Sequence, residues 1–275
     1  MTAKLSVSSN IPLIASKFFL LRHQLKHLKW IVATCIMAFV MNPAMAGTNG
    51  ATSSQLHKPS GKSASLLLAS SKHDDESRIV IRGVSLAEWT QRFWNRFMSI
   101  PVNVSPATDK TGIHCGINQA GPVWFLGAPL GGTNTLNCTI PAGKVILAPA
   151  ATYINDYPCP DPSFEPAIGQ TLEDFLTQGV TPIIDSFSTE VELDGKPLKL
   201  HRITAGIQSF TGAKDIAPSI DACVTGSPQL GVADGKYAVI GPLSPGQHIL
   251  HIQIDSPIFG NSDNTFHLTI FSQGS

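Results

Sequence analysis

The chain has 275 residues, of which 43% are hydrophobic, and its 19 basic and 19 acidic residues give a formal net charge of +0. It contains no block of Lys or Arg. This argues against a nucleic acid as the partner, because binding to a phosphate backbone needs clustered basic side chains. The most apolar run, Trp30–Val40, is shorter than the roughly 20 residues that cross a bilayer.

Residues 1–46 are predicted to be a secretory signal peptide. Five basic residues and no acidic one accompany the apolar run, and Pro43-Ala44-Met45-Ala46 supplies an A-x-A cleavage site. An uncleaved anchor and lipid attachment at Cys35 are the alternatives. Cleavage would remove five of the 19 basic residues and leave 14 against 19 acidic ones, a net charge of −5. We therefore expect a secreted or periplasmic protein whose mature part has no membrane span.

Residues 47–77 are predicted to be a disordered linker. Gly, Ser, Thr and charged residues dominate, and the only apolar patch is Leu66–Leu68. Such a segment buries too little surface to offset the entropy of ordering it. Residues 78–275 are long enough to form one domain with its own core.

Helices are predicted at residues 86–98 and 172–186. In the first, Ser85 and Glu88 form a capping box, and Pro101 ends the element. Its apolar side chains share one helical face: Leu86, Trp89, Phe93 and Phe97.

Most of the remaining chain is predicted to form short strands. Residues 135–140 and 144–148 flank a Pro-Ala-Gly turn and are expected to form a hairpin. Residues 191–200 form a second hairpin around Asp194-Gly195, a type I′ turn. Alternating segments at 248–254 and 265–271 are expected to form a third, with His251 opposite Thr269. Further strands are predicted at 79–81 and 123–126. The chain is therefore predicted to be mainly β, an antiparallel β-sandwich with one or two packed α-helices.

Four cysteines remain after the predicted cleavage, and disulfides are their expected state in an exported protein. We favour Cys115–Cys138 and Cys159–Cys223, because the first pair brackets one compact motif. A zinc site or a thiolate nucleophile is the alternative, but there is no C-x-x-C and no His-Cys spacing of the zinc type.

Residues 121–126 (GPVWFL), the Gly131-Gly132 turn and the CTIPAGK segment at 138–144 resemble an uncharacterised family of exported bacterial proteins. The likeness extends weakly over most of residues 84–255. It implies a shared fold and export, and it implies no reaction. Leu147 and Ala148 stand where that family usually has aromatic residues, so a pocket in this region would differ.

Candidate site residues lie around the first cysteine. Asp109, His114 and Gln119 could supply an acid, a base and a hydrogen-bond donor, although the same residues are common in ordinary turns. Trp94 and Trp124 are candidates for stacking on a ligand, and core packing is the alternative for both.

On the predicted C-terminal hairpin, His251 and His267 become diagonal neighbours and could hold a metal if a carboxylate joined them. Asn261 and Asp263 could bind calcium. Solvent-facing sheet histidines and an ordinary turn rich in Asn, Ser and Asp are the favoured interpretations of the two sets, and no cofactor is predicted.

The predicted function is the non-catalytic binding of a carbohydrate or of an envelope or extracellular protein partner. A secreted hydrolase with its site near Asp109, His114 and Gln119 is one alternative. A structural or assembly component is the other.

Overall fold

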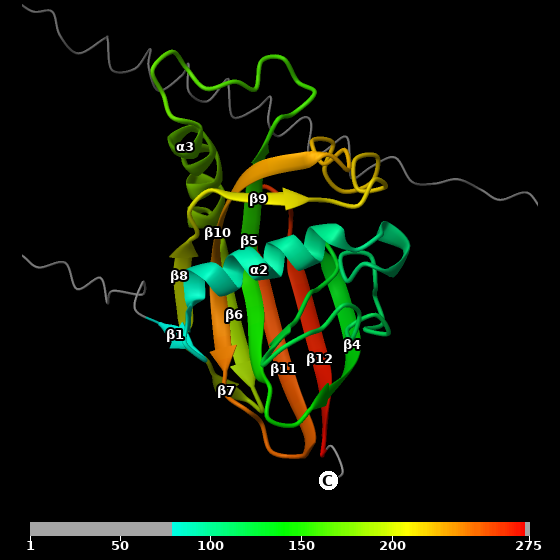
Figure 1. The fold of residues 1–275 in the computed structure, drawn as a ribbon. Coiled ribbons are helices and arrows are strands. Elements are labelled where there is room, and N and C mark those ends of the chain that lie inside the picture. The colour runs from blue at the N-terminus through cyan, green and yellow to red at the C-terminus, as the bar shows by residue number, and fades with distance from the viewer. Residues whose placement is uncertain (1–78, 273–275) are drawn as a thin grey trace, which may run out of the picture. The chain divides into compact units, whose positions relative to one another are not determined.

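The structure, a computed structural model, describes residues 79–272, so the predicted signal peptide and linker lie outside the described residues. The described part is mainly β, with two α-helices, as the sequence predicts (Figure 1). The helices are α2 (Leu86–Ser99) and α3 (Leu172–Asp185), and a 3-10 turn covers Val102–Val104. The strands are β1 (Val80–Ile81), β2 (Val84–Ser85), β3 (Val123–Phe125), β4 (Gly132–Pro141), β5 (Val145–Tyr157), β6 (Ser188–Leu193), β7 (Lys196–Pro197), β8 (Leu200–Thr204), β9 (Gln208–Thr211), β10 (Pro228–Ile240), β11 (Gly246–Asp255) and β12 (Ser262–Phe271).

Two five-stranded sheets pack face to face. The β10 sheet has the order β3-β5-β10-β8, with β9 also on β10, and the β12 sheet has the order β4-β12-β11-β6-β7. Between them lies an apolar core to which both sheets contribute alternate residues. Helix α2 covers the other face of the β10 sheet, so the order of the layers is helix, sheet, sheet (Figure 1).

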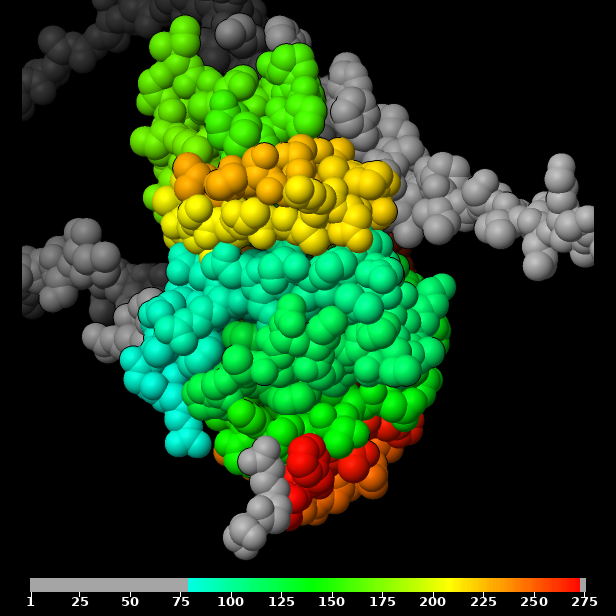
Figure 2. All heavy atoms as spheres, turned by 45° about the vertical axis from the view of Figure 1, so that its right-hand side comes forward, coloured from blue at the N-terminus to red at the C-terminus, as the bar shows by residue number. Residues whose placement is uncertain are grey.

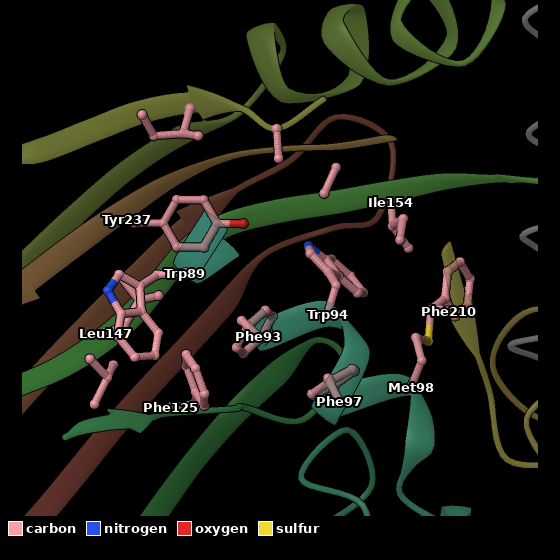
Figure 3. Packing of buried hydrophobic residues seen from close by; sticks show 14 of the residues in the cluster. Trp89, Phe93, Trp94, Phe97, Met98, Phe125, Leu147, Ile154, Phe210 and Tyr237 are labelled. Carbon is pink, nitrogen blue, oxygen red and sulfur yellow. The ribbon is translucent and has the colours of Figure 1, made fainter. Parts of the chain in front are cut away.

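Helix α2 forms because its sequence caps it and gives it one apolar face. Ser85 Oγ accepts a hydrogen bond of 3.2 Å from the Glu88 backbone N–H, which confirms the predicted N-terminus. Its aromatic side chains point inward against Phe125, Leu147 and Tyr237 (Figure 3). Helix α2 and the chain that follows it form a continuous surface on the outside of this layer (Figure 2).

The predicted hairpin at 135–148 is wrong, because β4 and β5 belong to different sheets. Alternate apolar residues of β4, such as Leu136, face Ile146 and Ala148 of β5 across the core instead of pairing with them edge to edge. The edges find other partners: β4 pairs with β12, and β5 pairs with β3 and β10. The β4–β12 and β3–β5 pairs are parallel. The sandwich therefore contains both parallel and antiparallel pairs, whereas the prediction was a wholly antiparallel one.

The two other hairpins are confirmed, with changes in detail. Asp194 and Gly195 adopt φ values of 51° and 73° between β6 and β7, as a type I′ turn requires. Asp194 also anchors the neighbouring turn, since its carboxylate meets His248 Nδ1 at 2.8 Å, and His248 Nε2 lies 3.0 Å from the carbonyl of Ser244. Strands β11 and β12 pair with His251 opposite Thr265, not Thr269.

Both predicted disulfides are confirmed. Cys115–Cys138 ties the loop before β3 to β4, and Cys159–Cys223 ties the segment after β5 to the segment before β10. All four sulfurs are therefore unavailable as thiolate nucleophiles or zinc ligands. Neither helix within residues 79–272 is long and apolar enough to cross a membrane.

Candidate functional site

An apolar pocket of about 340 Å³ lies beside strand β5. Its walls come from five parts of the chain: α2, the loop before β4, the middle of β5, the segment before β6, and the β11–β12 connection. The lining residues are Phe93, Trp94, Phe97, Gly127 to Gly131, Pro149 to Tyr153, Phe187, Ile254, Ser256, Ile258, Phe259, Gly260, Ser262 and Asn264.

The pocket exists because β3 is much shorter than its neighbour. Strand β3 pairs with Val145–Leu147 only, so the same edge of β5 has no neighbouring strand among the described residues from Pro149 onward. Proline suits this edge, since it has no N–H to donate to a missing strand. Just after β3, the chain passes so close to Pro106 that a Cβ atom on Gly127 would lie only 2.7 Å from Pro106 Cβ.

One wall of the pocket is the aromatic face of α2. Phe93, Trp94 and Phe97 pack together with ring centroids 5.5 to 5.7 Å apart (Figure 3). Trp94 is 7% exposed, and its indole N–H donates to Thr152 Oγ1 at 3.3 Å. The indole is therefore fixed with its ring at the pocket.

Another part of the lining contains a second aromatic group. The Phe259 ring stacks on Tyr153 at 5.9 Å and meets Phe187 edge-on at 5.8 Å. Phe259 is 37% exposed, and a tight turn holds it in place: Ser256 Oγ accepts hydrogen bonds from the backbone N–H groups of Ile258 and Phe259. Phe259 is thus a positioned, partly exposed aromatic residue at the pocket.

No lining residue carries a charge, and the polar side chains of the lining have hydrogen-bond partners within the protein. Thr152 Oγ1 lies 2.5 Å from the hydroxyl of Tyr237 and donates to the carbonyl of Asp234. Burial raises the pKa of Tyr237 well above its usual value, so this phenol is neutral. Asn264, 1% exposed, donates to Ser262 Oγ. The pocket can hold apolar groups, and it offers no positively charged side chain to pair with an anion.

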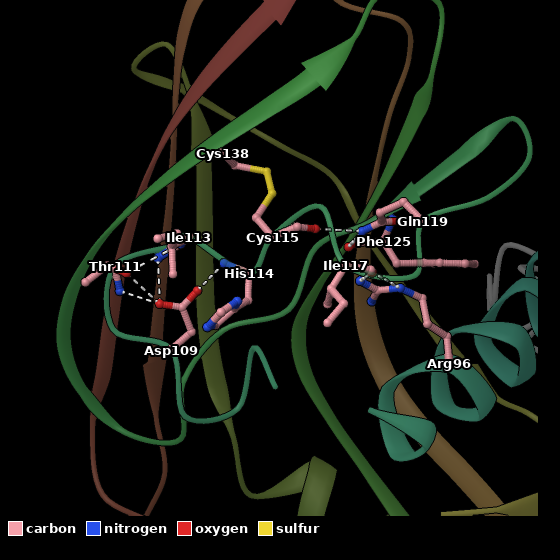
Figure 4. The surroundings of a disulfide bond; sticks show 11 residues. Arg96, Asp109, Thr111, Ile113, His114, Cys115, Ile117, Gln119, Phe125 and Cys138 are labelled. Atoms are coloured by element: carbon pink, nitrogen blue, oxygen red, sulfur yellow. Dashed lines mark hydrogen bonds between the residues drawn. A yellow bond between two sulfur atoms is a disulfide. The ribbon is translucent and has the colours of Figure 1, made fainter. Parts of the chain in front are cut away.

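The three residues predicted as a catalytic set do lie in one loop, but the side chains of Asp109 and Gln119 form hydrogen bonds with the backbone (Figure 4). The Asp109 carboxylate accepts hydrogen bonds from the backbone N–H groups of Thr111, Gly112 and His114 and from the Thr111 hydroxyl, at 2.7 to 3.0 Å. Partial burial alone would raise the pKa of Asp109, and these bonds outweigh it and hold the pKa below its usual value. A carboxylate stabilised in this way is a poor general acid or base at neutral pH.

The side chain of Gln119 bonds to the backbone N–H and carbonyl of Phe125 in β3, as a neighbouring strand would. Its side-chain N–H₂ donates to the carbonyls of Cys115 and Phe125 at 3.0 and 2.7 Å, and its Oε1 accepts from the Phe125 N–H at 3.0 Å. The buried Arg96 of α2 donates to the carbonyl of Ile117 in the same loop (Figure 4). The loop is therefore tied to both β3 and α2.

Of the two tryptophans predicted to stack on a ligand, Trp94 lines the pocket and Trp124 does not. Trp124 is 7% exposed within the core between the sheets. Trp89 is 3% exposed. None of the three described tryptophans offers an open ring face on the surface.

His251 and His267 lie on the outer face of the β12 sheet. They remain diagonal neighbours in the observed register, since His251 is opposite Thr265. His251 Nε2 is 2.7 Å from a carboxylate oxygen of Asp263, which is the residue also considered for calcium. Within residues 79–272, neither histidine belongs to a group of three His, Cys, Asp or Glu side chains close enough to hold a metal.

No sequence pattern indicated Tyr153, Phe187 and Phe259 as site residues. They lie on three separate segments without a shared period, so nothing along the chain relates them. Comparison of the chain with protein-family models, with curated proteins and with solved structures finds no match.

Proposed function

We propose that this protein is an exported, non-catalytic binding protein that holds a small hydrophobic molecule in the pocket beside β5. One observation carries the proposal: a cavity of about 340 Å³ with aromatic side chains on two walls and no charged lining residue. Cavities of roughly 300 to 1,000 Å³ with mostly apolar walls are typical of small-molecule sites.

Export is supported by the predicted signal peptide and by two disulfides. Disulfides persist in oxidising compartments, and here they join segments far apart in the sequence. A secreted or periplasmic location fits both features.

A hydrophobic ligand has more support than a carbohydrate. Sugars are usually bound by exposed aromatic faces together with polar groups that pair with hydroxyls. The described tryptophans are at least nine-tenths buried, and the polar side chains of the pocket already have hydrogen-bond partners within the protein. The hydrolase alternative has less support again, because Asp109 and Gln119 are committed to backbone hydrogen bonds.

Binding of N-phenyl-1-naphthylamine by the full-length, exported and oxidised protein tests the proposal. The emission of this neutral fluorophore rises in apolar surroundings, and we expect saturable binding. Ala151 is 3% exposed and lines the pocket, so Ala151→Leu should reduce the signal while the thermal transition stays cooperative. The absence of saturable binding to the wild-type protein would contradict the proposal.

A further inference from the structure

Building on the proposed function, we infer that the pocket selects ligands that contain a ring and carry no negative charge, and discriminates against anions and linear chains. The inference concerns which hydrophobic molecules the same site takes. Two independent features of the pocket lead to it: its charge and the chemistry of its walls.

Two nearby cations are bonded to other groups of the protein. Lys236 Nζ donates to the backbone carbonyl of Phe187 at 2.5 Å, and Arg202 forms two bonds of 2.5 and 2.6 Å to the carboxylate of Asp234. Neither cation lines the pocket. A carboxylate or sulfate group inside would lose its hydration without gaining a positive partner, which strongly disfavours binding.

The aromatic walls of the pocket favour a ligand that contains a ring. Aromatic pairs are favourable at centroid separations of 4.5 to 7 Å, and both walls already contain such pairs, Phe93–Trp94 at 5.6 Å and Tyr153–Phe259 at 5.9 Å. A flat ligand ring extends these arrangements. A linear chain gains no ring contact, and it loses more rotational freedom on binding.

The volume sets the size of the ligand. At about 340 Å³, the pocket is near the lower end of the roughly 300 to 1,000 Å³ that is typical of small-molecule sites. Small bicyclic compounds of the naphthalene class are therefore suitable probes.

Two matched pairs of probes test the inference by isothermal titration calorimetry on the full-length oxidised protein at neutral pH. The first pair is 2-naphthamide and 2-naphthoate, which share shape and differ in charge. The second is 2-naphthol and 1-decanol, which are both neutral and have equal numbers of non-hydrogen atoms. We expect the amide to bind at least about tenfold more tightly than the carboxylate, and naphthol to bind more tightly than decanol.

The place of binding is tested by replacing two phenylalanines whose exposed fractions are nearly equal. Phe259 is 37% exposed at the pocket, and Phe271 is 39% exposed at the end of β12 and does not line it. Phe259→Ala should weaken naphthol binding about fivefold, as expected for the loss of one aromatic contact, and Phe271→Ala should leave it unchanged.

The outcomes separate the two claims. If no probe binds, the proposed function itself fails. If naphthoate binds as tightly as naphthamide, or decanol as tightly as naphthol, the pocket binds hydrophobic molecules but the selectivity inferred here is wrong. Equal effects of Phe259→Ala and Phe271→Ala would mean that binding occurs elsewhere.

Discussion

Replacing Gln119 tests whether this side chain completes the β-structure at β3 or serves catalysis. It makes three hydrogen bonds, to the carbonyls of Cys115 and Phe125 and from the Phe125 N–H. Each such bond contributes about 1 kcal/mol net, and the loop is only partly buried, so water replaces some of them. We therefore expect Gln119→Ala to lower the free energy of unfolding by about 2 to 3 kcal/mol.

The isosteric Gln119→Glu separates hydrogen bonding from shape. At neutral pH it keeps the acceptor for the Phe125 N–H but places carboxylate oxygens against two carbonyl oxygens. The folded state therefore raises the pKa of the introduced carboxyl, and the destabilisation should shrink as the pH falls and that group becomes protonated.

Urea unfolding of the oxidised protein at pH 7.5 and pH 4.5 measures both effects. The control is Gln253→Ala, because Gln253 is exposed on β11 and its one bond is long, at 3.5 Å; we expect a change below about 0.5 kcal/mol. If Gln119→Glu is as stable as wild type at pH 7.5, the role assigned to Gln119 is wrong.

Three further predictions concern stability. The bond to Asp194 raises the pKa of His248, so this pair contributes most to stability at pH values below the unfolded-state pKa of about 6.5. Its contribution is lost as the pH rises through the raised folded-state pKa. The difference in unfolding free energy between wild type and His248→Gln should therefore shrink from pH 6 to pH 8, and a constant difference would contradict this. Replacing Cys159 and Cys223 together by serine should cost about 4 kcal/mol, the chain-entropy value for a separation of 64 residues, measured by guanidinium unfolding; a loss below about 1 kcal/mol would refute that estimate. Asp109→Ala should lower the melting temperature by several degrees, because four accepted hydrogen bonds are lost, whereas a catalytic role alone would leave the melting temperature unchanged.

Local sequence signals predicted those parts of the fold that depend on neighbouring residues. The N-cap at Ser85, the type I′ turn at Asp194-Gly195 and the alternation along β11 and β12 are all observed. The Glu88 carboxylate, which was expected to complete a capping box, accepts a hydrogen bond from Arg92. The pairing of Cys115 with Cys138 was also predictable, because the two residues bracket one compact motif.

The pairing of strands that are far apart in the sequence could not be predicted from local signals. Alternation shows which side of a strand is buried but not which strand lies beside it, so β4 and β5 were expected to pair when they instead face each other across the core. The β11–β12 register depends on the turn in which the Gly260 N–H donates to the Ser256 carbonyl, which shortens the connection. The pocket depends on the early end of β3, and no residue within the pocket signals it.

The central claim is that a small hydrophobic molecule enters the pocket beside β5, and the indole N–H signals of the protein test it most directly. The Trp94 indole lines the pocket, and the Trp124 indole lies in the core between the sheets at the same 7% exposure. During titration of the ¹⁵N-labelled protein with 2-naphthol, we predict a saturable shift of the Trp94 resonance while the Trp124 resonance stays in place. A saturating titration that leaves Trp94 unmoved, or that shifts both indoles alike, would contradict the account.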